Sequence, residues 1–117
     1  MSHSAQALRA YANARATRSP RELEADVFRH ANAMLRRAGE GDRRARIRAL
    51  ADNERLWSTV IDLVRDPQNA LPMELRAAIV SVGLPVQREM RVPEPDFAFL
   101  MTVNESIAAG LAGAASQ

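Results

Sequence analysis

The chain has 117 residues, of which 47% are hydrophobic and 26% charged, and its formal net charge is +2. It has no cysteine and only two histidines, His3 and His30, so disulfides, thiolate chemistry and a histidine-based metal site are excluded. Aromatic residues make up 4% and alanine is abundant, which favours helices because alanine loses least on entering one. The length and composition predict one all-α domain.

Apolar residues recur at spacings of three and four in five segments, which predicts a single small bundle of four to five helices with short loops. The first segment has a thin apolar face around Leu8 and needs a partner surface to be helical. A strong helix start follows, with Ser19 as N-cap, Pro20 at the first position and Glu22 completing a capping box. We expect Gly39 to end this helix through the left-handed conformation.

The later helices have equally local signals. Asp42 caps the third helix, and Asp66 followed by proline stops it. Leu71-Pro72 begins the fourth, which Pro85 is expected to kink or end early. Asp96 caps the last, and the tail beyond Gly110 is expected to fray. The predicted helices cover about residues 5–17, 20–38, 42–65, 72–90 and 96–111.

Nothing in the sequence predicts catalysis or a cofactor. Gly39-Glu40-Gly41 lacks the preceding strand that a phosphate-binding turn needs. Carboxylates near helix starts, such as Glu22 and Asp26, complement the helix dipole. No apolar run approaches the ~18 residues of a membrane span, and the N-terminus has no apolar signal region. The sequence therefore predicts a soluble, cytoplasmic, non-enzymatic protein without membrane association.

All basic residues are arginine, and they concentrate at the junction of the second and third predicted helices. Three interpretations of this cluster stay open: a solvated junction, a surface for an acidic protein, and a nucleic-acid site. It lacks interleaved aromatic residues, which argues against reading single-stranded bases. The cluster comprises Arg36, Arg37, Arg43, Arg44, Arg46 and Arg48.

The apolar surface exceeds what one bundle core requires. Leu56 and Trp57 are adjacent, so both cannot face the centre, and one of them is expected at a boundary that a partner helix covers. Asn53, one turn before Trp57, is expected to cap a neighbouring helix or to satisfy a buried backbone group. Either docking within the domain or partner binding explains the apolar start of the last helix. The residues predicted to contact a partner are Leu56, Trp57, Phe97, Leu100 and Met101.

Several motifs in order along nearly the whole chain resemble the FlaF family of flagellar biosynthesis regulators. They read Asn-Glu-Arg-Leu-Trp from Asn53, Asn-Ala-Leu-Pro from Asn69 and Leu-Arg-Ala-Ala-Ile from Leu75. Pro85 departs from the family pattern. The residues that carry the resemblance are Tyr11, Asn53, Trp57, Leu71, Pro72, Leu75, Arg76, Ile79 and Asn104.

The resemblance implies a small cytoplasmic protein required for flagellin production and export. It also implies action opposite FlbT, the repressor of flagellin translation, and direct flagellin binding as a chaperone or regulator. The alternative is a post-transcriptional regulator that binds RNA through the arginine cluster, or one that binds FlbT. Oligomeric state and the flagellin segment bound do not follow from the sequence.

Overall fold

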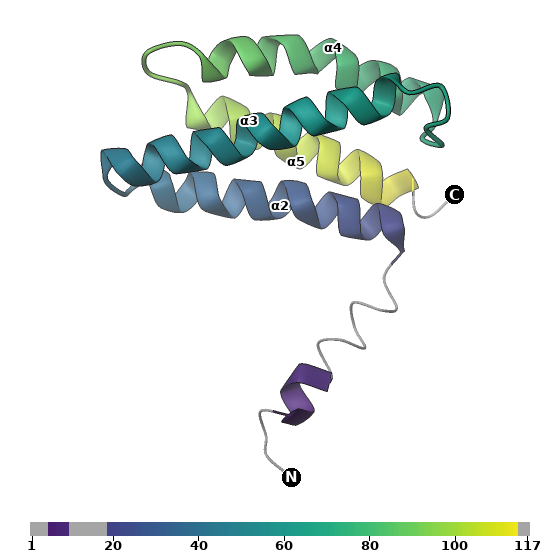
Figure 1. The fold of residues 1–117 in the computed structure, drawn as a ribbon, viewed down its shortest axis with the longest axis horizontal. Helices are drawn as coiled ribbons and strands as arrows, with labels where there is room; N and C mark the ends of the chain where they lie inside the picture. Colours follow the sequence, from purple (N-terminus) through teal and green to yellow (C-terminus); the bar gives the residue numbers. More distant parts are fainter. Residues whose placement is uncertain (1–4, 10–18, 115–117) are drawn as a thin grey trace.

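The computed structural model describes residues 5–9 and 19–114 and is built from helices (Figure 1). The four long helices are α2 (Pro20–Gly39), α3 (Arg43–Arg65), α4 (Met73–Met90) and α5 (Phe97–Ala114). Residues 5–9 are also helical, whereas the rest of the predicted first helix, including Tyr11, lies outside the described residues. The described residues contain no strand, and the prediction of an all-α fold is confirmed.

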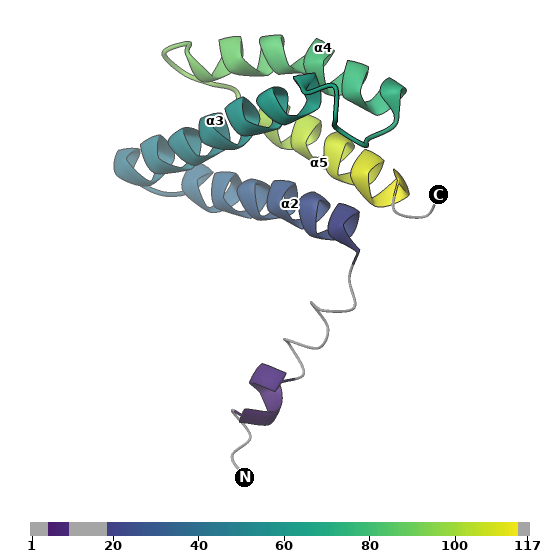
Figure 2. The same cartoon turned by 45° about the vertical axis from the view of Figure 1, so that its right-hand side comes forward.

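The four helices form a splayed bundle. α2 packs mainly against α5, and α3 packs against both α4 and α2. α2 and α3 run antiparallel from the turn that joins them and diverge toward the other end, while α4 lies on the side of α3 away from α2 (Figures 1 and 2). Where they diverge, α2 and α3 line a cavity together with residues of α4, α5 and the loop between α3 and α4.

Side-chain caps begin three of the helices where the sequence predicts. Ser19 Oγ accepts a hydrogen bond from the Glu22 N–H at 3.1 Å, and the Glu22 carboxylate completes the capping box. Asp42 Oδ1 accepts from the Ala45 N–H at 2.8 Å at the start of α3. Asp96 accepts from the N–H of the third residue of α5. Each cap satisfies an N–H that has no partner inside the helix.

The structure corrects part of what was expected at three helix ends, although α2 and α4 end within one residue of the predicted bounds. α2 ends at Gly39 with Glu40 in a right-handed conformation (φ −100°, ψ 0°), and no described glycine has a positive φ. α4 continues through the exposed Pro85 to Met90 because its buried Val86 and Met90 hold the last turn in the core. α5 continues past Gly110 to Ala114, since Leu111 is also buried.

α5 is long and apolar enough to cross a membrane by length and composition alone, which the sequence analysis did not predict. Its apolar side nevertheless faces the other helices, where Leu100, Ile107 and Leu111 are buried. Asn104 and Glu105 interrupt the apolar sequence of this helix near its middle. We therefore interpret α5 as a helix of the bundle that packs against α2 and α4 and contributes one side to the core.

Candidate functional site

A chain of buried polar side chains joins α3, α5 and α4. The Trp57 indole N–H donates to Asn104 Oδ1 at 2.8 Å, and the Asn104 amide donates to Asn53 Oδ1 at 2.8 Å. The Asn53 amide donates in turn to the sulfur of Met90 at 3.2 Å. Trp57, Asn53 and Asn104 are all 0% exposed. Asn53 thus neither caps a helix nor binds the backbone, which corrects both expectations for it.

Other motif residues also stabilise the fold. Arg76 donates from Nε to the Val64 carbonyl and from Nη2 to the Asp66 carbonyl, each at 3.0 Å, and so binds the free carbonyls at the end of α3. Asn69 Oδ1 accepts from the Leu71 N–H at 3.0 Å and shapes the turn before α4. The remaining motif positions in this region place Pro72 before α4, Leu75 against Gly110, and Leu71 and Ile79 in the core.

Three of the five residues predicted to contact a partner lie in the core. Trp57 and Leu100 are fully buried, and Phe28 meets the Trp57 ring edge-on at 5.7 Å. Phe97 is 9% exposed, and the Arg46 guanidinium covers its ring at 4.5 Å. A partner therefore reaches Trp57 and Leu100 only if the helices separate, and contact with these three residues stays a prediction.

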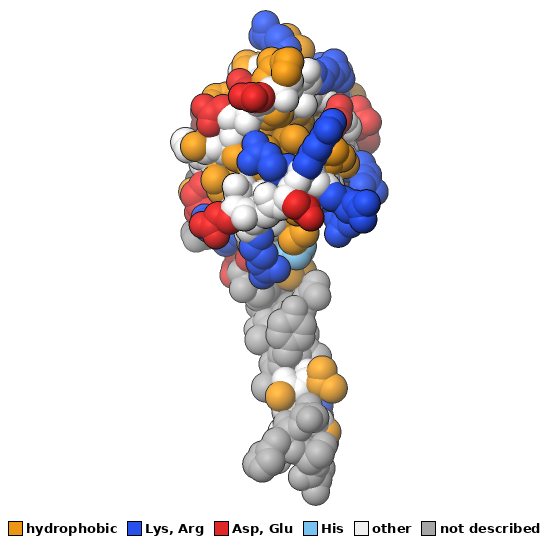
Figure 3. All heavy atoms as spheres, turned by 90° about the vertical axis from the view of Figure 1, so that its left-hand side faces the viewer, with side chains coloured by type: hydrophobic (Ala, Val, Ile, Leu, Met, Phe, Trp, Pro, Cys, Tyr) orange, Lys and Arg blue, Asp and Glu red, His pale blue; other side chains and the backbone are white. Residues whose placement is uncertain are grey.

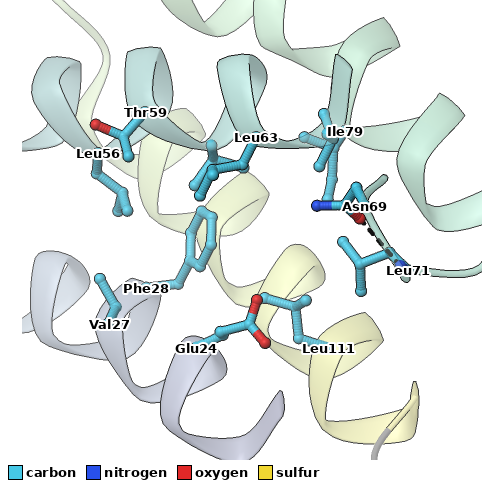
Figure 4. Close-up of a pocket in the computed structure, with 12 residues that line it drawn as sticks. Glu24, Val27, Phe28, Leu56, Thr59, Leu63, Asn69, Leu71, Ile79 and Leu111 are labelled. Atoms are coloured by element: carbon cyan, nitrogen blue, oxygen red, sulfur yellow. Dashed lines mark hydrogen bonds between the residues drawn. The ribbon is translucent and has the colours of Figure 1, made fainter. Parts of the chain in front are cut away.

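Leu56 is half-buried and lines a cavity of about 190 Å³ between the diverging parts of α2 and α3. Figure 4 shows Leu56 and Val27 pointing toward each other from these two helices. Phe28, Ile79 and Leu111 form the inner wall of the cavity. We call this feature the α2/α3 groove. Its lining comprises Glu24, Val27, Phe28, Leu56, Thr59, Val60, Leu63, Val64, Asn69, Leu71, Ile79 and Leu111.

The rim of the α2/α3 groove exposes two aliphatic side chains that the sequence analysis did not single out. Val27 is 52% exposed and Leu63 is 56% exposed. Both belong to rows of apolar residues at helical spacing, which are expected to face the core. The only indication in the sequence is that these rows are wider than one buried face requires. A dry cavity of about 150 Å³ can hold benzene. The groove is therefore large enough for an apolar side chain of a partner.

Met101 lies on a different surface, between α2 and α5. This second, more open depression has a volume of about 700 Å³, and Asn32 and Arg36 also line it. Asn32 donates to the Met101 carbonyl at 2.9 Å, while its own buried amide oxygen has no hydrogen-bond partner. Leu56 and Met101 thus do not form one binding surface.

The arginine cluster surrounds the turn between α2 and α3. Five of its six side chains are exposed, and none forms an ion pair within the described part of the chain. Glu40 and Asp42 lie in the same turn. Figure 3 looks onto this end of the molecule and shows arginine side chains on several sides, with acidic side chains between them. The surface is therefore mixed in charge rather than a continuous basic track.

No group of three or more metal-binding side chains gathers within residues 5–9 and 19–114. Among curated proteins and solved structures, none matches the chain. A family model described as Flagellar protein FlaF does match it, over residues 7–111. That match covers nearly the whole chain, including all four long helices up to Leu111 in α5. The chain therefore belongs to the FlaF family of flagellar proteins.

Proposed function

We propose that this protein binds flagellin in the cytoplasm and promotes its synthesis or secretion, in the manner of a chaperone and without catalysis. Membership of a flagellar protein family supports the flagellar context. The observation that carries the proposal is the α2/α3 groove, because its rim leaves Val27 and Leu63 more than half exposed. Exposed apolar side chains around an apolar cavity are typical of a binding surface.

The shape of the α2/α3 groove suits a helical ligand. An amphipathic helix presents apolar side chains every three or four residues, and two diverging helices offer a groove into which such a stripe fits. The terminal segments of flagellin are expected to be amphipathic and unfolded before assembly. Binding would cover their apolar stripes together with Val27, Leu56 and Leu63, which removes apolar surface of both partners from water. Because the groove is already formed, little rearrangement opposes binding.

The test replaces single exposed side chains at the groove and away from it. Leu63→Asp and Val27→Asp place a carboxylate on the rim, where a bound apolar stripe would desolvate it. We expect each to weaken binding to monomeric flagellin by about tenfold or more, measured by calorimetry. Leu84→Asp on α4 is the matched control, because Leu84 is 60% exposed but lies outside the groove, and we expect binding to be unchanged.

Calorimetry at two temperatures and two salt concentrations adds a second criterion. Apolar capture predicts a negative heat-capacity change and a complex that persists at moderate salt. Equal affinities for Leu63→Asp and Leu84→Asp would remove the groove from the proposal. Absence of a complex between flagellin and the unmodified protein would contradict the proposed function itself.

The arginine cluster supports a second candidate, binding of RNA or of FlbT as a post-transcriptional regulator. The observation in its favour is that six guanidinium groups lie around one turn without ion pairs in the described part of the chain. Binding of RNA would weaken steeply with salt, because each phosphate contact releases counterions. The acidic residues within the turn favour a protein surface over a phosphate backbone as the ligand of this cluster.

A further inference from the structure

The face of α2 and α3 that bears the groove continues to the turn between them. Along α2, Met34 follows Val27 by seven residues and lies nearly in line with it, whereas Arg37, three residues further on, is about 80° from Val27 around the helix. Along α3, Arg48 lies eight residues before Leu56 and is likewise about 80° from it. The two arginines therefore lie toward the turn end of α2 and α3, beside the line of the groove's apolar rim.

The charges on this face are unevenly distributed. At the groove end, both oxygens of the Glu24 carboxylate bind Arg21, at 2.8 and 3.0 Å. Asp52, between Leu56 and Arg48, pairs with Arg55 at 3.0 Å. Arg37 and Arg48 are exposed and have no ion pair within the described residues. The face is thus apolar at one end, and at the other it carries two arginines without an ion pair in the described residues, near Glu40 and Asp42 of the turn.

We propose that the flagellin segment in the α2/α3 groove is an amphipathic helix with an acidic residue beyond its apolar stripe, and that Arg37 and Arg48 bind this residue. This inference rests on the proposed function and adds the chemistry and direction of the bound segment. Val27 and Arg37 are separated by about 15 Å along α2, at 1.5 Å per residue. The acidic residue therefore lies about ten residues from the apolar anchor, on the side toward the α2–α3 turn. This spacing is the same whether the bound helix runs parallel or antiparallel to α2.

The arginine pair sets the direction of the bound helix more than its affinity. A segment that ran the opposite way would place its apolar residues beside Arg37 and Arg48 and its carboxylate over Val27 and Leu63, at a desolvation cost. Complementary charges at the edge of an interface also accelerate association at low salt. Apolar contacts in the groove and charge contacts at the turn would together select one segment in one orientation.

Two adjacent arginines in the last turn of α2 provide the experiment. Arg37→Glu reverses the charge on the groove face. Arg36→Glu makes the same change in net charge, but Arg36 lines the depression between α2 and α5. We expect Arg37→Glu to weaken binding of monomeric flagellin by about tenfold at low salt and by less at moderate salt. Arg36→Glu should change the affinity by less than about twofold.

Arg48→Glu should reproduce the effect of Arg37→Glu from the other helix. Arg37→Gln, which removes the charge without reversing it, serves if the reversal disturbs folding as seen by circular dichroism. Equal effects of Arg36→Glu and Arg37→Glu overturn this inference, and the groove proposal survives if Leu63→Asp still weakens binding as expected. Failure of the unmodified protein to bind flagellin overturns both.

Discussion

At the residue scale, Asn104 links two buried side chains of α3 through hydrogen bonds. Its carbonyl oxygen accepts from the Trp57 indole, and its amide group donates to Asn53. All three side chains are 0% exposed, so water cannot replace either hydrogen bond. A buried tryptophan normally needs a partner for its N–H, and here that partner comes from another helix. One asparagine therefore satisfies polar groups on α3 from α5.

Asn104→Ala should strongly destabilise the fold. The change leaves the Trp57 N–H and the Asn53 oxygen buried without partners, and each unsatisfied group costs about 1–3 kcal/mol. We expect the free energy of unfolding to fall by about 2–4 kcal/mol, measured by urea denaturation with the fluorescence of Trp57, the only tryptophan. Asn69→Ala, which removes a half-buried turn contact, should cost about 1 kcal/mol. Similar losses in the two variants would contradict this role of Asn104.

The sequence predicts part of this arrangement and not its centre. The adjacency of Leu56 and Trp57 predicts that one of them lies at a boundary, and Leu56 is indeed half-buried while Trp57 is fully buried. The hydrogen bond between Trp57 and Asn104 spans 47 positions. Helical periodicity indicates which side of a helix faces inward, but it does not pair a polar group on one helix with a polar group on another.

At the element scale, α3 and α4 approach each other closely at Gly83. A Cβ atom on Gly83 would lie 2.7 Å from Ile61 Cδ1 and 3.1 Å from Ile61 Cγ1. Ile61 is itself 6% exposed and packed in the core, so its side chain has little space in which to move. The absent side chain of Gly83 thus lets the two helices pack at this distance.

Gly83→Ala should therefore destabilise the protein although alanine is the better helix former. Overpacking costs about 1–3 kcal/mol, against a gain of about 1 kcal/mol from helix propensity. Ile61→Val removes the Cδ1 atom nearest to the new methyl group, so the double variant should be more stable than the additive sum of the two single changes. Urea denaturation of the four proteins measures this coupling.

Gly39→Ala is the control for Gly83→Ala, because a Cβ at Gly39 meets nothing within 4 Å and its φ is not positive. We expect Gly39→Ala to stabilise the protein by about 0.5–1 kcal/mol. Stabilisation by both alanines, or additive behaviour of Gly83→Ala with Ile61→Val, would show that α3 and α4 adjust freely at this contact.

The beginnings of helices were predictable because the signals are local. Ser19 and Asp42 each bind an N–H three residues ahead, so the sequence alone contains both partners. The continuation of α4 through Pro85 depends instead on Val86 and Met90 finding buried positions against other helices. A rule based on the loss of one hydrogen bond cannot weigh that tertiary contribution.

At the scale of the whole molecule, the candidate site arises from how the helices diverge. Val27 and Leu63 belong to apolar stripes, yet each is more than half exposed at the rim of the groove, where α2 and α3 diverge (Figure 2). The sequence predicts an excess of apolar surface but not its location. That location depends on the packing of α2 against α5 and of α3 against α4.

The arginines at the start of α3 are opposite in sign to the charge that the N-terminal end of a helix favours. α3 begins with Arg43 and Arg44 and has no acidic residue in its first turn, although the N-terminal end of a helix dipole is positive. Other arginines around the same turn add repulsion. The Asp42 carboxylate at the N-cap offsets part of this charge, and the guanidinium groups that have no ion pair within the described residues agree with a cationic binding surface at this end.

Two charge reversals in α3 measure how much the repulsion between these arginines lowers the free energy of unfolding. Arg43→Glu puts an acidic side chain at the positive end of the dipole and separates neighbouring guanidinium groups, so it should raise the free energy of unfolding by about 0.3–1 kcal/mol. Arg65→Glu makes the same change in charge in the last turn, where the dipole favours a cation, and should lower the free energy of unfolding by a similar amount. The two effects, measured by urea denaturation, should shrink together at high salt because both residues are exposed. Equal signs for the two variants would mean that net charge, rather than its position along α3, governs stability, and the arginines at the turn would then carry no local penalty.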